Sequence, residues 1–309
     1  MNEKDKNKKS SRRNFLRTGG FSIAAIAMAN VARSCTSDDG ESGEKAKVLG
    51  TDGKLVEVDK AHVNHCMHSS DPVDRKKARE GIPYRKFVMV IDLARCANAR
   101  KCVTKCQEAH HLRGDQEWMK VFRMQDNKNT SPYWLPKTCF HCDDAPCVNV
   151  CPVGASYKRS DGLVLVDNEQ CIGCKYCMVA CPYETRTFTW HPTEELENGA
   201  GHEHSPETSL PHKTGTVGKC DFCPDMLREN KLPHCVTACP MGTIYFGDLN
   251  EDTVTNGSKT VRFSKLMEER GGYRYMEYFG TKPNVYYLPP VNRSFPFKEA
   301  EVNEDTKES

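Results

Sequence analysis

CIGCKYCMVACP, residues 171–182, is the stretch that decides the fold of this chain. Its four cysteines follow the spacing C-x2-C-x2-C-x3-C, and a proline follows the last of them. Bacterial electron carriers hold iron-sulfur cubes through thiolates at this spacing. Three thiolates of one tight loop can face one cube, whereas the fourth, on the next helical turn, points towards a neighbouring cube. The stretch therefore predicts one cluster here and a second one nearby.

Three further cysteine groups supply ligands for more clusters. The group at 139–152 reads C-x2-C-x4-C-x3-C-P, and the group at 220–240 reads C-x2-C-x11-C-x3-C-P. Zinc knuckles also use C-x2-C pairs, and exported proteins use cysteines for disulfides. Neither kind of site explains a closing C-x3-C in every group, so we predict iron-sulfur ligation. The proline after the closing cysteine ends the local helical turn.

The first cysteine group is one ligand short. It would repeat the spacing of residues 171–181 if position 99 were cysteine, but Ala99 stands there. The cysteines that remain in this group are Cys96, Cys102 and Cys106.

Ala99 leaves three outcomes for this group. The site holds a three-iron cluster, which needs only three thiolates; it holds a four-iron cluster completed by an oxygen or nitrogen ligand; or it is empty. The candidate non-cysteine ligands are Asn98, His110, His111 and a solvent hydroxide. Retention of the other cysteines favours the three-iron cluster, so we expect an occupied but abnormal site.

Composition excludes several other classes of protein. The net charge is +2, from 44 Lys+Arg and 42 Asp+Glu, so the chain lacks the basic footprint of a nucleic-acid-binding protein. Hydrophobic residues make up 38 % of the 309 residues, which predicts a small apolar core. No dinucleotide fingerprint, phosphate loop or nucleophile constellation is present in the sequence. We therefore expect a non-catalytic electron-transfer protein that binds no nucleic acid.

The N-terminal sequence predicts an export signal. SRRNFLR, residues 11–17, resembles a twin-arginine signal, and the apolar stretch at 19–32 is too short to span a membrane. This route suits a protein whose clusters must be inserted before it crosses the membrane. Cys35 then begins an acidic tether, and both lipidation of Cys35 and simple cleavage remain open. We expect a periplasmic protein with no membrane span of its own.

The positions of the cysteine groups divide the chain into four parts. The predicted parts are a signal at 1–34, a polar linker at 35–83, a duplicated domain at 84–250 with an exposed insertion at about 192–214, and a C-terminal arm at 251–309. Apolar and β-branched runs predict strands in this domain and in the arm. The strands are expected at 84–92, 155–157, 162–167, 187–190, 243–246 and 284–289.

The order and spacing of the four groups resemble a known family. The C-x2-C-x4-C-x3-C second group and the long gap inside the fourth are similar to those of the iron-sulfur subunits of dimethyl sulfoxide, polysulfide and tetrathionate reductases, which are molybdopterin oxidoreductases. The resemblance covers about residues 84–250. It implies an α+β fold of two interlocked bacterial ferredoxin-like modules with an N-terminal tether and a C-terminal arm.

The resemblance also implies crossed ligation, in which the first group pairs with the fourth and the second with the third. Three [4Fe-4S] clusters and one abnormal cluster, for which we expect [3Fe-4S], would then be bound. The implied iron ligands are Cys139, Cys142, Cys147 and Cys181 for cluster A; Cys171, Cys174, Cys177 and Cys151 for cluster B; Cys220, Cys223, Cys235 and Cys106 for cluster C; and Cys96, Cys102 and Cys239 for cluster D.

Members of this family pass electrons between other subunits. The resemblance therefore implies a molybdopterin-containing catalytic subunit and a quinone-binding membrane subunit as partners. The alternatives are a free periplasmic polyferredoxin shuttle, a subunit linked to a hydrogenase or formate dehydrogenase, and a zinc-binding structural protein. The long arms argue against a free shuttle, and acid-labile sulfide would exclude the zinc protein.

Several conspicuous side chains are interpreted as structural. A chance cluster in the polar linker accounts for His62, His65, Cys66 and His68. An exposed insertion accounts for His202, His204 and His212. Core packing that shields the clusters accounts for Trp118, Trp134 and Trp190. Lys175, beside Cys174, either favours the reduced cluster by its charge or is simply solvated.

Overall fold

The computed structural model of the chain describes residues 45–49, 55–59, 74–128, 130–192 and 204–291. The chain divides into two compact units, Met1–His68 and Ser69–Ser309. In the first unit, β1 (Lys45–Leu49) pairs antiparallel with β2 (Leu55–Asp59). The predicted features that lie outside the described residues are the signal at 1–34, Cys35, the cluster at 62–68 and His202.

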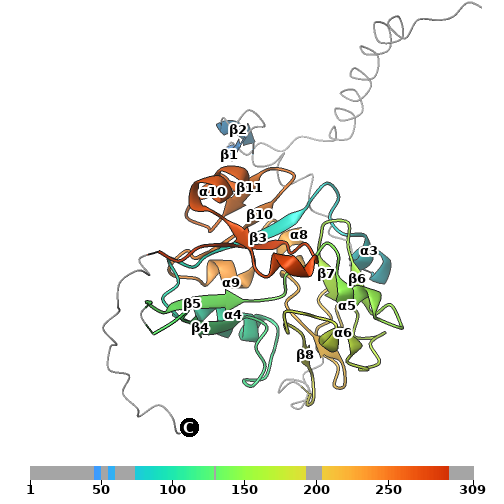
Figure 1. The fold of residues 1–309 in the computed structure, drawn as a ribbon. Coiled ribbons are helices and arrows are strands. Elements are labelled where there is room, and N and C mark those ends of the chain that lie inside the picture. Colours follow the sequence, from blue (N-terminus) through green and yellow to red (C-terminus); the bar gives the residue numbers. More distant parts are fainter. Residues whose placement is uncertain (1–44, 50–54, 60–73, 129, 193–203, 292–309) are drawn as a thin grey trace, which may run out of the picture. The chain divides into compact units, whose positions relative to one another are not determined.

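A mixed sheet forms the centre of the second unit (Figure 1). Within the described residues it has the strand order β12-β11-β10-β3-β14-β13. All neighbours pair antiparallel except β3 and β14, which are parallel. The strands are β3 (Phe87–Asp92), β10 (Ile244–Asp248), β11 (Thr253–Thr255), β12 (Thr260–Arg262), β13 (Tyr273–Arg274) and β14 (Val285–Leu288).

β3 is buried on both faces and separates two apolar cores. Successive side chains of a strand point to opposite faces. Met89 and Ile91 accordingly join the core that contains the cysteines, whereas Val88 and Val90 join a smaller core. The continuous run of apolar residues in β3 is what a strand covered on both sides requires.

The predicted C-terminal arm supplies much of the smaller core. Its described part forms β11 to β14, the helix α10 (Phe263–Arg270) and the 3-10 helix η1 (Glu277–Phe279). Leu266 of α10 and Leu288 of β14 pack with Val88 and Val90 in that core. Figure 1 shows α10 and β11 beside β10. The segment after residue 250 is therefore part of the same sheet as β3.

The cysteine loops lie on the other face of the sheet, among short helices and hairpins (Figure 1). α4 packs on α9, and α5 packs on α6. The helices are α3 (Arg75–Glu80), α4 (Lys101–Ala109), α5 (Pro146–Asn149), α6 (Tyr176–Val179), α8 (Pro224–Arg228) and α9 (His234–Thr237). The hairpins are β4 (Lys120–Met124) with β5 (Tyr133–Lys137), β6 (Ser156–Lys158) with β7 (Val164–Val166), and β8 (Thr187–Phe188) with β9 (Val217–Gly218).

The fold is thus mixed helix and sheet, as the sequence predicts. The expected strands at 84–92, 155–157, 162–167, 243–246 and 284–289 correspond to β3, β6, β7, β10 and β14. The expected strand at 187–190 is reduced to the two residues of β8.

Exposure of the insertion at about 192–214 is a wrong prediction for its described end. Glu207, Ser209 and His212 are buried. The reason is an ion-pair network: the Glu207 carboxylate accepts hydrogen bonds from Arg159 and, at 2.7 Å, from Arg228. Arg159 is itself fully buried against Asp161. Because the partners are far apart in the sequence, no local pattern signals this burial.

We predict that Glu207→Gln destabilises the protein by about 3–5 kcal/mol. The substitution keeps the shape of the side chain but leaves two arginines, one of them fully buried, without their shared carboxylate. Urea unfolding followed by tryptophan fluorescence measures the change. The matched control is Glu269→Gln, which removes an exposed pair with Lys265 and should cost less than about 0.5 kcal/mol. Equal small effects would contradict the role of the buried network.

Candidate iron-sulfur centres

The cysteine loops share an unusual backbone shape. Asn98 and Arg100 of the first loop have φ values of 56° and 52°, and Gly173 and Lys175 at the matching positions of the third loop have φ values of 69° and 64°. Left-handed residues inside a turn make successive backbone N–H groups converge on one point, and this arrangement favours the binding of an anion there. The first loop therefore keeps the shape of the third, although it lacks one thiolate.

Two closing cysteines of Cys-Pro turns, Cys151 and Cys239, accept backbone hydrogen bonds. The Ser156 N–H donates to the Cys151 thiol at 3.4 Å, and the Thr243 N–H donates to the Cys239 thiol at 3.3 Å. Burial acts to raise the pKa of Cys151, but the N–H groups of residues 153–156 outweigh it and hold that pKa below its ordinary value. The turn after Cys151 therefore favours its thiolate.

Set A, the thiols predicted to hold cluster A, is gathered at one place. Burial raises the pKa of the Cys142 thiol to about 12, and the neighbouring Cys139, Cys147 and Cys181 thiols act in the same direction. Cys181 belongs to the third group in the sequence, yet its thiol lies beside the second group. The structure thus brings together the ligands that crossed pairing requires.

Set B, the thiols predicted to hold cluster B, lies nearer the surface. Burial raises the pKa of the Cys177 thiol, and the thiols of Cys171 and Cys151 contribute to the increase. Here Cys151, from the second group, lies beside the third. Cys174, on the same loop, is exposed.

Set C, the thiols predicted to hold cluster C, is the most deeply buried. Burial raises the pKa of Cys106 well above its usual value, and the Cys220 and Cys235 thiols add to the effect. Burial likewise raises the pKa of Cys223, with contributions from Cys220 and Cys235. Cys106 comes from the first group and the other three come from the fourth.

Set D, the thiols predicted to hold cluster D, has three members. Burial raises the pKa of Cys102 to about 11, and the Cys239 and Cys96 thiols act in the same direction. A hollow of about 350 Å³ is lined by these three cysteines together with Ala99 and Asn98. The neighbouring thiols in sets A, C and D, and Cys151, Cys171 and Cys177 of set B, are those that the resemblance groups together, while ligation itself stays a prediction.

The donor sets fit iron-sulfur clusters. All described cysteines are free thiols, and a hollow of about 310 Å³ is lined by the thiols of set C. Thiols with the raised pKa values of Cys102 and Cys142 are protonated near pH 7 unless a cation binds. A bound metal displaces such protons, and soft thiolates favour iron-sulfur clusters. Groups of buried thiols without disulfides are therefore explained by clusters.

The four sets follow one another in the order B, A, C, D. Sets B and A meet where α5 packs on α6. Burial raises the pKa of Cys220 to about 12, and the Cys139 thiol is among the groups that add to the increase, so set A adjoins set C. Burial also raises the pKa of Cys235, with a contribution from Cys102, so set C adjoins set D. The four thiol sets therefore form one row.

Comparison with known proteins agrees with this arrangement. The family described as 4Fe-4S dicluster domain matches residues 130–197 and 208–249. The B subunit of the selenate reductase from Mesobacillus selenatarsenatis is 31 % identical over 305 residues, which are 91 % of this chain and 98 % of that protein. The B subunit of the tetrathionate reductase from Salmonella typhimurium is 33 % identical over 217 residues, 68 % of this chain and 74 % of that protein.

The chain belongs to the family of iron-sulfur subunits of the dimethyl sulfoxide and tetrathionate reductases. The B subunit of the sulfite dehydrogenase from Allochromatium vinosum, 36 % identical over 66 % of this chain and 83 % of that protein, is a further relative. These relatives are B subunits of oxidoreductases. Among the described residues of this chain, no helix has the length and apolar content that a membrane crossing requires.

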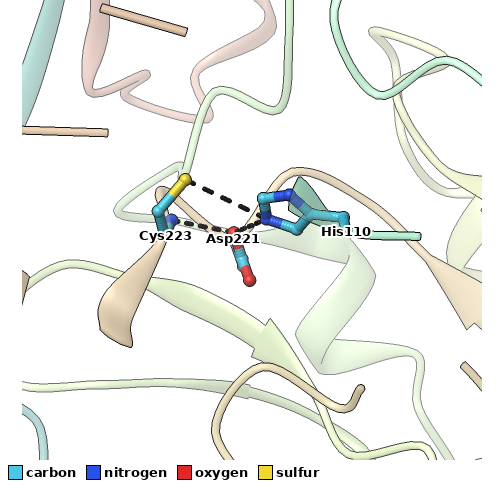
Figure 2. Close-up of side chains that lie close together, drawn as sticks. All are labelled: His110, Asp221 and Cys223. Carbon is cyan, nitrogen blue, oxygen red and sulfur yellow. Dashed lines mark hydrogen bonds and ion pairs between the residues drawn. The ribbon is translucent and has the colours of Figure 1, made fainter. Parts of the chain in front are cut away.

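His110 is not a ligand candidate for set D, which corrects one of the alternatives for the Ala99 site. Its Nδ1 donates to the Cys106 carbonyl at 3.1 Å. Its Nε2 lies 3.0 Å from an Asp221 carboxylate oxygen and 3.9 Å from the Cys223 sulfur (Figure 2). Neither His110 nor His111 lines the hollow of set D.

Asn98 remains as a protein ligand candidate at set D. It lines the hollow of set D, and its Oδ1 is buried without a hydrogen-bond partner among the described residues. Ala99 is exposed, in the position that the exposed Cys174 has in the third loop. The missing thiolate therefore corresponds to a corner of the cluster that faces solvent.

Asp221 and His110 form a buried pair beside set C that the sequence analysis missed. Burial acts to lower the pKa of His110, but the Asp221 carboxylate raises it above its usual value. Burial also acts to raise the pKa of Asp221, and His110 holds it lower. Asp221 in addition accepts the N–H of Cys223 at 2.8 Å, so the pair fixes this loop. Asp221 lies between Cys220 and Cys223 in the sequence, and this position was the signal that could have indicated the pair.

Three aromatic predictions have different outcomes. Trp118 is buried as predicted, with its ring 4.8 Å from that of His110 and 4.9 Å from that of His212. Trp134 is half-buried. Trp190 is 62 % exposed, so its placement in the core is wrong. The Lys175 ammonium lies 3.7 Å from the centre of the Trp190 ring, a cation-π contact at the surface.

His212 is a neutral buried histidine, whereas the sequence predicts an exposed one. Burial lowers its pKa to about 3. Asn168 donates from Nδ2 to its Nδ1 at 3.1 Å, which ties the end of the insertion to the segment after β7. His204 is half-buried.

Proposed function

We propose that this chain carries electrons through three [4Fe-4S] clusters and one [3Fe-4S] cluster inside an exported, membrane-associated oxidoreductase. The electrons pass between a quinone-binding membrane subunit and a molybdopterin catalytic subunit, and the chain catalyses no reaction of its own. The observation that supports this most strongly is the single row of thiol sets, B, A, C and D. The row ends near the surface on one side at Cys174 and on the other at the partly exposed Cys96 and Cys239.

The protein contributes binding, burial and local charge. When bound, the clusters supply reversible one-electron chemistry. The thiolates of each set hold the iron, the left-handed loops direct N–H groups towards it, and the apolar core around β3 excludes water. These groups decide where an electron resides, because burial and hydrogen bonds to sulfur set cluster potentials.

The [3Fe-4S] assignment for cluster D follows from the exposed Ala99. Three thiolates suffice for three irons, and no thiol occupies the fourth corner of the site. A four-iron cluster completed by the Asn98 side-chain oxygen is the alternative. The three-iron and the four-iron cluster differ in iron content and in the paramagnetic signal of the oxidised protein.

The cellular placement is part of the proposal. The twin-arginine sequence at 11–17 supports export of the folded, cluster-loaded chain to the periplasm. Cys35 either carries a lipid or is removed with the signal, and partners hold the chain at the membrane. The interlocked modules, joined by crossed ligation, and the tether at 35–83 complete this proposal.

The first test counts iron and acid-labile sulfide in anaerobically purified protein and records electron paramagnetic resonance (EPR) of the oxidised sample. We expect about 15 irons per chain and a three-iron signal. About 16 irons without this signal would favour Asn98 or another non-cysteine ligand, and about 12 would mean that site D is empty. Zinc without sulfide would overturn the proposal.

The second test addresses the partners. A tagged chain expressed in its own host should co-purify with molybdenum and with a quinone-binding membrane protein. Recovery of the iron-loaded chain alone, after mild detergent extraction, would instead support a free shuttle. Recovery with nickel, or with formate-dependent activity, would support the hydrogenase or formate dehydrogenase alternative.

A further inference from the structure

Arg186 is a buried arginine without a carboxylate partner among the described residues. Only 4 % of it is exposed. Its Nη1 donates to the Ser156 hydroxyl at 2.9 Å, but its Nε and Nη2 are buried and meet no acceptor among the described protein atoms. Buried charges and buried donors without partners are costly, so such groups are normally paired. The groups beside the guanidinium are the thiols of Cys147 and Cys177, so its charge is balanced only when these sulfurs carry negative charge.

The position of Arg186 indicates which clusters these sulfurs belong to. Burial raises the pKa of the Cys147 thiol of set A, and the Arg186 guanidinium opposes this increase. The same holds for the Cys177 thiol of set B. Cys147 lies on α5 and Cys177 on α6, and these helices pack together. Arg186 therefore lies between the sites of clusters A and B.

We propose that Arg186 is a positioning residue shared by clusters A and B: its free N–H groups donate to sulfurs of both clusters, and its charge raises both reduction potentials. The inference rests on the proposed function, because it requires both clusters to be bound. It assigns a role to a residue outside the cysteine motifs.

The direction of the effect follows from charge. A cube with thiolate ligands is an anion, and reduction by one electron makes it more negative. A nearby fixed cation therefore stabilises the reduced form, and hydrogen bonds to sulfur act in the same direction. An arginine remains protonated at any pH the protein survives, and its planar fork can direct donors to two acceptors. One side chain can thus raise the reduction potentials of two neighbouring clusters together.

Two other cations near the row of sites, Lys219 and Lys175, are already engaged. The Lys219 ammonium is buried, but it donates to the Val164 carbonyl and, at 2.8 Å, to the Cys220 carbonyl. The Lys175 ammonium lies over the rings of Phe188 and Trp190. Arg186 differs from both in retaining buried donors without acceptors.

The test compares Arg186→Met and Arg186→Lys in the full-length, cluster-loaded chain. Potentials are measured by EPR-monitored titration at fixed pH, after iron and sulfide counts show that no cluster has been lost. For Arg186→Met we expect two of the midpoint potentials to fall by at least about 59 mV. For a one-electron step this corresponds to a tenfold shift of the equilibrium away from the reduced cluster. Arg186→Lys should move the same two midpoints in the same direction but less, because it keeps the charge and loses the fork.

The controls separate this inference from the proposed function. Arg85→Met removes an arginine that pairs with Asp248 at 3.2 Å, and should leave all midpoints unchanged. An unmodified chain without iron would contradict the proposed function. Iron-replete Arg186 variants in which no midpoint or only one midpoint moves would overturn the inference alone. If Arg186→Met fails to retain its clusters, the Arg186→Lys midpoints decide, and unchanged values would overturn it.

Discussion

Ala99→Cys is expected to raise the iron content from about 15 to about 16 per chain and to abolish the three-iron signal of the oxidised protein. Ala99 has the place in the first loop that Cys174 has in the third, and left-handed residues flank both positions. The backbone is therefore already shaped to present a thiolate at position 99. The substitution supplies the missing ligand without rebuilding the loop.

The same substitution should lower the potential of cluster D. A fourth thiolate adds negative charge beside the cluster, which disfavours reduction. Iron analysis and EPR-monitored titration of the variant measure both effects. The control is Ala94→Cys, which adds a thiol five residues away, outside the lining of the hollow of set D, and should change neither the iron count nor the signal.

Two outcomes would contradict the three-iron assignment. Ala99→Cys protein with unchanged iron and an unchanged signal would show that position 99 does not face the cluster. An unmodified chain with about 16 irons and no oxidised signal would point to Asn98, whose buried Oδ1 has no partner among the described residues. In that case Asn98→Ala should lower the count to about 15, because it removes the only side-chain oxygen of that residue.

The cysteine sets could be anticipated from the sequence because cluster ligation is local. Each loop contributes two or three thiols within a few residues, and its closing cysteine follows on the next turn. The resemblance supplied the crossed pairing, and the structure places Cys181 beside Cys142 and Cys151 beside Cys177 as that pairing requires. β3 could also be anticipated, since the run of β-branched and aromatic residues at 84–92 favours a strand.

Long-range polar contacts could not be anticipated in the same way. Glu207 is buried because Arg159, 48 residues earlier, faces it. Arg186 is buried although arginine is usually exposed. Its proposed role depends on the contact between α5 and α6, which are distant in the sequence and meet only in the fold. Trp190 shows the reverse error: a large aromatic residue was assigned to the core by type alone, whereas it covers Lys175 at the surface.

The largest effects on cluster content are expected from the closing cysteines. Cys181→Ala should damage cluster A, whose other ligands come from the second group, and should spare cluster B, whose loop is adjacent in the sequence. The expected loss is between about one and about four irons, together with one redox midpoint. Cys151→Ala should do the reverse, since its thiol lies beside Cys171 and Cys177.

Two reference variants identify which cluster has been damaged. Cys142→Ala removes a ligand of cluster A from the second loop, and Cys174→Ala removes a ligand of cluster B from the third. In EPR-monitored titrations, the midpoint lost in Cys181→Ala should be the one lost in Cys142→Ala. The midpoint lost in Cys151→Ala should match that of Cys174→Ala. The opposite matching would mean that each cysteine group holds its own cluster, and the row of interlocked sites would have to be abandoned.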